Sequence, residues 1–187
     1  MQHKNINMNR FQEKKIVECL AYLSSKVDLT DVKAYKLLWL ADRMHLGLYA
    51  RTITGDDYYA LERGPVPSCV KMIVNRRLQS DIFDNFFRVE GKSLKRTSSM
   101  PQYEYLSETD IKVLNQIIEA YGNYSESELT DLSHKSPEWK RCESKFKGKK
   151  KSFKMGMDDF FIDFEDPKRL FVRNGEPEIA KSVYYCE

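Results

Sequence analysis

Asp42 and His45 are the residues whose types and spacing first suggest chemistry. They lie three positions apart in an apolar stretch of helical periodicity, so one helix face would carry both side chains. A carboxylate beside an imidazole can transfer protons, or it can supply half of a metal site. A complete metal site needs a further donor, and His134, Cys142 or a carboxylate would have to come from a distant segment.

The alternative is a structural role for the same pair. Asp42 would then pair with Arg51 or Arg63 and anchor the following loop, and His45 would pack half-buried. The sequence has no H-x-x-x-H motif and no closely spaced second pair of ligands, which favours the structural role. We therefore predict no catalytic residue, no metal and no cofactor, and we do not expect an enzyme.

Both residues belong to residues 36–68, the stretch around which the rest of the chain is expected to pack. It begins as the most apolar helix of the sequence, and a helix that is apolar on most of its circumference must be surrounded by other elements. A turn at residues 53–56 and a short strand at residues 58–61 follow. The motif GPVPS at residues 64–68 then predicts a stiff, exposed corner that leads into a third helix.

The remaining segments predict further helices and one hairpin. A helix over residues 11–26 is capped by Asn9, and a hairpin over residues 86–98 turns at Gly91. Ser107, Ser125 and Ser136 open later helices. The lysine run at residues 145–154 predicts a mobile loop, and the acidic, aromatic residues 158–166 predict a docked helix. The tail after Pro167 is ambiguous between an edge strand and a partner contact.

These elements predict a mainly α (α+β) fold, namely a compact helical domain around a central buried helix with a small antiparallel β-hairpin or sheet. We divide the chain into a helical domain, residues 1–166, and a C-terminal extension, residues 167–187. At 187 residues the chain can form one full core. The polar start and the lack of a long apolar run exclude a signal peptide and a membrane span.

Cysteine usage and charge exclude further classes of protein. The four cysteines are far apart and form no C-x-x-C pair, which is typical of free thiols in a reducing cytoplasm. A net charge of +3 is too small to indicate nucleic-acid binding by itself.

Four motifs in order, KLLWLADR, LYARTITGDDYYALERGPVPS, LSETD and SHKSPEW, resemble the Panacea domain. This domain is also called the SocA-like antitoxin domain and is related to phage-associated proteins of the GepA type. The resemblance covers roughly residues 14–164, with one departure at Ala50, where the family pattern has glycine before the arginine. The residues from Pro167 onward fall outside the pattern.

The resemblance implies a cytoplasmic antitoxin of a bacterial or prophage toxin–antitoxin pair, which neutralises the toxin of an adjacent gene by direct protein–protein binding. It also implies a common scaffold with variable contact surfaces. One branch of the family is similar to an adaptor that delivers its toxin to a protease, so this role stays open as an alternative.

The predicted partner-binding surface runs along the central helix and the loop, strand and corner after it. Exposed aromatic residues are typical of interfaces, although the same residues can form a core, and the GPVPS corner can simply aim the next helix. The residues of this predicted surface are Trp39, Asp42, Arg43, Tyr49, Arg51, Thr54, Gly55, Asp56, Tyr58, Gly64, Pro65, Val66, Pro67 and Ser68.

A second hypothesis is a DNA-binding regulator that uses the third helix and the hairpin as a helix plus wing. Basic residues on these two elements would meet phosphates: Lys71, Arg76, Arg77, Arg88, Lys92, Lys95 and Arg96. Asp81, Asp84 and Glu90 dilute this charge, so a solvated charged face is the alternative.

Overall fold

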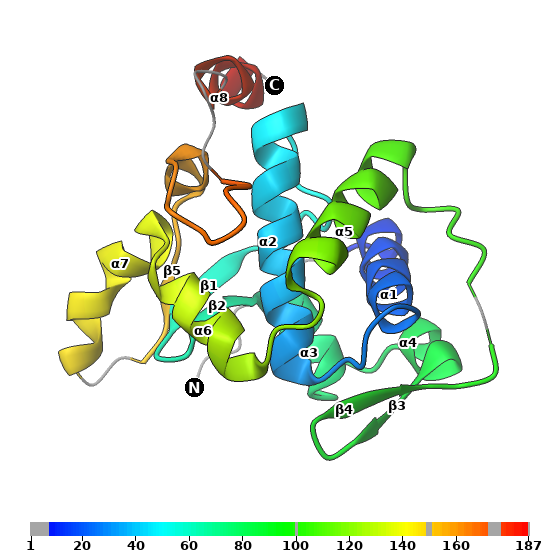
Figure 1. Cartoon of the computed structure of the whole chain (residues 1–187). Helices are drawn as coiled ribbons and strands as arrows, with labels where there is room; N and C mark the ends of the chain where they lie inside the picture. Colours follow the sequence, from blue (N-terminus) through cyan, green and yellow to red (C-terminus); the bar gives the residue numbers. More distant parts are fainter. Residues whose placement is uncertain (1–7, 100, 149–150, 172–176, 187) are drawn as a thin grey trace.

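Helix α2 (Asp31–Tyr49) runs through the middle of the molecule, as Figure 1 shows. We analysed a computed structural model of the chain, which describes residues 8–99, 101–148, 151–171 and 177–186. From Ala34 to Gly47 every residue of α2 is buried. Thr30 caps its N-terminus and accepts a hydrogen bond from the N–H of Lys33. The predicted central buried helix is confirmed.

Helices α1 (Arg10–Ser24) and α5 (Glu108–Tyr121) lie on the same side of α2 in Figure 1. The side chain of Asn9 caps α1, accepting from the N–H of Gln12 at 2.8 Å. Ser107 and Asp110 form a reciprocal capping box at the start of α5. The predicted starts of both helices are thus confirmed, and α1 and α5 bury apolar faces in the common core.

A small antiparallel sheet with the order β2-β1-β5 lies on the opposite side of α2 from α1 (Figure 1). Its strands are β1 (Tyr58–Leu61), β2 (Gly64–Pro67) and β5 (Phe153–Lys154). The predicted exposed corner at residues 64–68 is wrong, because residues 64–67 pair with β1 as a strand and all four are buried. Proline is tolerated in this strand because β2 is at the sheet edge.

Two short helices and a hairpin follow the sheet. Helix α3 (Ser68–Val74) follows residues 64–67, as predicted, and α4 (Asp81–Phe86) precedes the hairpin β3 (Phe87–Glu90) and β4 (Ser93–Arg96). The hairpin turns at Gly91, whose φ of 62° is left-handed, as the sequence predicts. The hairpin contacts the start of α2, where the N–H of Asp31 donates to the carbonyl oxygen of Lys92 at 2.9 Å.

Helices α6 (Glu126–His134) and α7 (Pro137–Glu143) continue the chain beside the sheet (Figure 1). The lysine run was predicted to be a loop, but its described residues include the end of the 3₁₀ helix η1 (Ser144–Lys147) and strand β5. Residues 149 and 150 lie outside the described residues. The predicted helix at residues 158–166 is only the short 3₁₀ helix η2 (Met157–Phe161), followed by irregular chain whose Phe164 is buried.

The packed core continues past residue 166 and includes Phe171. Phe171 is 1% exposed, and its ring stacks on Phe164 at a centroid distance of 5.1 Å. Asp166 accepts from the N–H of Phe171 at 3.0 Å. The core therefore extends beyond the predicted boundary at residues 166/167. Helix α8 (Pro177–Cys186) lies near the C-terminal end of α2 (Figure 1), and residues 172–176 lie outside the described residues.

The mainly α fold with a small β part is confirmed. In the described part of the chain, no helix is long and apolar enough to cross a membrane. Among the described residues the four cysteine thiols are free, three buried and Cys186 exposed.

Candidate functional site

Asp42 anchors the loop that follows α2. Its carboxylate is fully buried and accepts from the backbone N–H groups of Ile53 at 2.7 Å and Thr54 at 2.9 Å. It also accepts from the hydroxyl of Thr54, and from that of Tyr58 at 2.7 Å. Burial raises the pKa of Asp42, while these hydrogen bonds oppose the rise. The loop-anchoring role is as expected, but the partners are backbone and hydroxyl groups rather than Arg51 or Arg63.

Asp56 holds the start of α3. Its two carboxylate oxygens accept from the N–H groups of Cys69 and Val70 at 2.9–3.0 Å, and Ser68 donates its hydroxyl at 3.0 Å. A carboxylate here satisfies N–H groups that have no partner within the helix and complements the helix dipole. The side chain that satisfies the start of α3 thus comes from a residue twelve positions before Ser68.

Lys36 supports the β1–β2 hairpin by hydrogen bonds to its backbone. Its ammonium group donates to the carbonyl oxygens of Arg63 at 2.6 Å and Pro65 at 3.1 Å. Burial, with a contribution from the charge of Arg63, lowers the pKa of Lys36 to about 7. A Cβ at Gly64 would lie 2.3 Å from the Lys36 Nζ and 2.2 Å from the Ser133 Oγ, and its φ is 95°, so only glycine fits.

Arg43 and Trp39 on α2 meet Glu138 on α7. The buried carboxylate of Glu138 accepts from Trp39 Nε1 at 3.0 Å and from Arg43 Nη1 at 2.9 Å. The guanidinium of Arg43 also donates to the Asp159 and Ile162 carbonyl oxygens. Burial raises the pKa of Glu138, and the charge of Arg43 opposes the rise. This network ties α7 and the chain after η2 to the central helix.

His45 and Asp110 join α2 to α5. His45 Nε2 lies 3.1 Å from Asp110 Oδ1, and Nδ1 lies 2.8 Å from the Arg51 carbonyl oxygen. Arg51 Nη2 and Lys15 Nζ also reach the Asp110 carboxylate, at 2.9 Å and 2.8 Å. Burial opposes the charge of Asp110, but hydrogen bonds from His45, Lys15 and the Ser107 N–H outweigh it and lower its pKa.

The structure does not bring the suggested proton-transfer or metal residues together. Asp42 faces the loop at residues 53–58, whereas His45 contacts Asp110. His134 instead stacks on Trp139 at a centroid distance of 3.8 Å. The described residues contain no group of three or more His, Cys, Asp or Glu side chains placed to hold a metal ion.

Much of the predicted partner surface is in the core, which requires a correction. The buried members are Trp39, Asp42, Arg43, Thr54, Asp56, Tyr58, Gly64, Pro65, Val66 and Pro67. These residues pack between α2 and its neighbours or satisfy backbone groups, so in this conformation they are not part of the exposed surface. Tyr49 and Gly55 are exposed, and Arg51 and Ser68 are half-buried, so their partner role stays a prediction.

The exposed end of α2 carries apolar side chains. Leu48 is 44% exposed and Tyr49 is 36% exposed, and the Tyr49 ring lies 4.7 Å from the His45 ring. Gln12 on α1 donates to the carbonyl oxygens of Thr54 and Gly55 at 3.2 Å and 2.7 Å, which fixes the adjacent loop. We define the α2-end face as Leu48, Tyr49, Arg51 and Gly55.

The basic residues of the DNA hypothesis are mostly exposed, with Lys71 half-buried: Arg76, Arg77, Arg88, Lys92, Lys95 and Arg96 lie on or beside α3 and the hairpin. Two of them are engaged with the α4 residue Asp84. Arg76 forms an ion pair with its carboxylate, and Arg88 donates to its carbonyl oxygen. Since α3 is only seven residues long, it offers little length to a groove. DNA binding stays a prediction.

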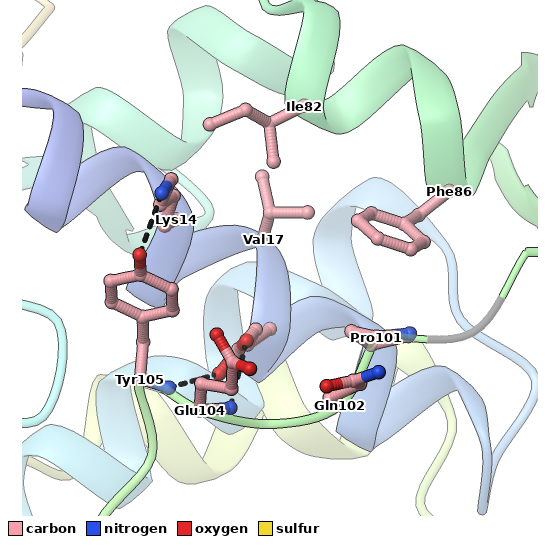
Figure 2. Close-up of a pocket in the computed structure, with 9 residues that line it drawn as sticks. Lys14, Val17, Ile82, Phe86, Pro101, Gln102, Glu104 and Tyr105 are labelled. Atoms are coloured by element: carbon pink, nitrogen blue, oxygen red, sulfur yellow. Dashed lines mark hydrogen bonds between the residues drawn. The ribbon is translucent and has the colours of Figure 1, made fainter.

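A cavity of about 260 Å³ lies between α1, α4 and residues 101–105 (Figure 2), and none of the residues that line it belongs to the α2-end face. Lys14 donates to the Tyr105 hydroxyl at 2.6 Å. Glu18 accepts from the N–H groups of Glu104 and Tyr105. These polar groups already have partners within the chain, and the rest of the wall is largely apolar, so the cavity has little to recognise a ligand with.

Sequence reasoning missed Lys36, Asp110 and Glu138 as organising residues. Lys36 had a signal, since a lone lysine beside LLWL on the most apolar helix must be buried or reach a surface. Asp110 and Glu138 are early acids of predicted helices, and their long-range contacts with α2 have no local sequence signal.

A model of one protein family, described as "Antitoxin SocA-like, Panacea domain", matches residues 35–140, more than half of the chain. The protein is therefore of the antitoxin class in general terms. More particularly, the chain belongs to the SocA-like antitoxin family and carries its Panacea domain, which confirms the resemblance. Comparisons with curated proteins and with solved structures find no match.

Proposed function

We propose that this protein neutralises a cognate protein toxin by direct binding and catalyses no reaction of its own. Family membership supports an antitoxin with a protein partner in general. The observation that carries the binding mechanism is the α2-end face, where Leu48 and Tyr49 are exposed on a helix held on its other sides by buried contacts. Tyrosine is enriched at binding hot spots, and an adjacent exposed apolar side chain on a rigid support suits a contact surface.

The contacts of the buried acidic and imidazole groups support the proposal that the protein catalyses no reaction. Asp42 and Asp56 hold backbone N–H groups, and His45 and Asp110 hold two helices together. A general acid or base needs access to a substrate, and these side chains have no such access in the core.

Co-expression with the product of the adjacent gene tests the proposal. We expect a complex on size-exclusion chromatography and restored growth of cells that express the toxin. Leu48→Asp and Tyr49→Asp should each raise the Kd at least about tenfold, which corresponds to about 1.4 kcal/mol. The free energy of unfolding should change by less than about 1 kcal/mol, because both side chains are exposed.

Lys95→Glu is the matched control, since it changes an exposed residue on β4, away from the α2-end face. A complex that tolerates both aspartate variants would contradict the assignment of the face. The absence of any complex and of any rescue would contradict the function itself.

The two alternatives predict different measurements. A DNA-binding regulator predicts affinity for its upstream sequence that falls with salt, with a smaller slope after Arg77→Gln. A protease adaptor predicts faster degradation of the partner when this protein is present.

A further inference from the structure

A cavity of about 360 Å³ lies between the start of α2, the turn of the β1–β2 hairpin and α3. Its volume falls in the lower range for ligand pockets and suits one or two side chains. It is lined by four basic side chains, Lys36, Arg63, Lys71 and Lys151. Two acidic residues, Asp31 and Glu62, also line it, so the formal charge of its wall is positive.

Three of these basic side chains have no carboxylate partner within the described residues. Lys36 donates only to carbonyl oxygens, and no Asp or Glu oxygen of the described chain lies within 4.0 Å of the Arg63 or Lys71 side-chain nitrogens. Glu62 is already paired, with Lys151 at 2.8 Å. The wall therefore holds more positive charge than the chain neutralises.

Crowding and burial already oppose the charges of these lysines. Burial and the charge of Arg63 lower the pKa of Lys36 to about 7. Burial and the charge of Arg77 lower the pKa of Lys71, and the charge of Asp31 opposes part of this effect. A bound anion would stabilise the charged form of both groups.

The rest of the wall indicates which anion fits. Tyr35, Leu61 and Val66 supply apolar surface, which suits the methylene groups of an acidic side chain. A nucleic-acid backbone fits poorly, because it needs a row of cations, whereas here Asp31 and Glu62 share the wall of a single cavity.

We propose that this cavity binds a glutamate or aspartate side chain of the partner polypeptide. The carboxylate of that side chain pairs with Lys71 and Arg63, close to Lys36. This inference rests on the function proposed above, and it names the chemistry of one partner anchor. Charge-assisted hydrogen bonds to a partly buried carboxylate contribute more than an exposed ion pair does.

The isolated protein tests the chemistry without the toxin. The probes are a glutamate blocked at both ends, its blocked glutamine analogue and inorganic phosphate, each titrated while backbone amide NMR shifts are followed. We expect millimolar binding of the blocked glutamate around residues 61–66 and 71, weakened at high salt, with at least tenfold weaker binding of the glutamine analogue. Equal binding of the glutamine analogue, or no binding of either, overturns the proposal, as does phosphate bound as tightly as the carboxylate.

Variants then identify the cations. Lys71→Gln and Arg63→Gln should each weaken binding of the blocked glutamate at least about fivefold. Arg63 is exposed and Lys71 half-buried, so the fold should persist, as checked by amide spectra. Lys95→Gln, outside the cavity, is the control and should bind like wild type. Unchanged binding in the first two variants overturns the proposal.

The complex separates this inference from the proposed function. If the adjacent-gene product binds wild type and the doubly substituted Arg63→Gln, Lys71→Gln protein loses at least tenfold in affinity, the cavity is an anchor site. If the complex forms and is insensitive to that double substitution, the anchor is refuted and the antitoxin function stands. If no complex forms, the function is refuted, whereas the probe titration still reports on the cavity chemistry.

Discussion

Asp42, Asp56 and Lys36 each bond to the backbone of a different segment. Asp42 holds the loop after α2, Asp56 holds the start of α3, and Lys36 holds the hairpin turn. Burying a charge is costly unless polar groups surround it, and here the polar groups are backbone groups that need partners. These three residues therefore specify the local conformation as well as contribute to stability.

Asp42→Ala should lower the free energy of unfolding by about 3 kcal/mol. The change leaves the Ile53 and Thr54 N–H groups and the Tyr58 hydroxyl without their acceptor in a dry site. Urea denaturation gives the value. The control is Asp57→Ala, whose 2.7 Å pair with Lys154 is more than half exposed, and it should cost less than about 1 kcal/mol. Equal losses in the two variants would contradict the anchoring role.

Lys36→Met should change how stability depends on pH. The pKa of Lys36 is about 7 in the folded chain and 10.5 when unperturbed. Between these values the unfolded chain holds a proton that the folded chain has lost, so this lysine makes stability rise with pH. The unfolding free energy of wild type minus that of the variant should increase by about 1 kcal/mol per pH unit from about pH 7 to 9, and be nearly flat below about pH 6.

Urea denaturation at each pH measures this difference. Lys95→Met, which removes an exposed lysine, is the control for the loss of a surface charge. A pH-independent difference for Lys36→Met would mean that the amine stays charged in its site.

At the scale of elements, the C-terminal end of α2 is formed by a residue whose side chain disfavours the backbone conformation that it adopts there. Ala50 is the C-cap residue, with φ of 55° in the left-handed region. A Cβ makes this conformation unfavourable, and glycine is the usual residue at such a helix end. The family resemblance implies glycine at this position, and the left-handed φ of Ala50 is a physical reason for that expectation.

Ala50→Gly should therefore raise the free energy of unfolding by about 0.5–1 kcal/mol. The same substitution within α5, Ala120→Gly, should lower it by about as much, since glycine loses more backbone entropy in a helix. Denaturation midpoints compare the two variants. A loss in both would show that the α2 terminus is not strained.

At the scale of the whole molecule, the chain after residue 166 helps to close the core around α2. The Phe171 ring packs on Tyr121 and Phe164, and the Arg43 guanidinium lies 5.7 Å from its centroid. The matched family region ends at residue 140, so these contacts are made by chain outside that region. The fold of this chain thus depends on residues beyond the matched segment.

Truncation tests this dependence. A chain that ends at residue 171 should unfold cooperatively. The free energy of unfolding of a chain that ends at residue 166 should be lower than that of the 171-residue chain by about 3 kcal/mol or more. Phe171→Ala in the full chain should reproduce most of that loss, because it removes the same buried ring. Equal stability of the two truncated chains would place the edge of the core at residue 166.

The sequence by itself determined the features that depend on neighbouring residues. The apolar periodicity of α2, the caps at Asn9 and Ser107, and the turn at Gly91 are all local signals. The order of motifs in residues 36–68 also determined the family, because a long ordered pattern is specific. These signals need no knowledge of which segments meet.

Only the tertiary structure decided which polar and aromatic residues of the predicted partner surface are buried and which are exposed. Tyr58 and Val66 could have been exposed by local criteria, but the pairing of β1 with β2 and the packing on α2 bury them. Lys36 holds the hairpin turn because folding brings the carbonyl oxygens of Arg63 and Pro65, distant in sequence, within hydrogen-bond distance of its Nζ. Burial is a property of how segments pack, so residue type and spacing alone cannot assign it.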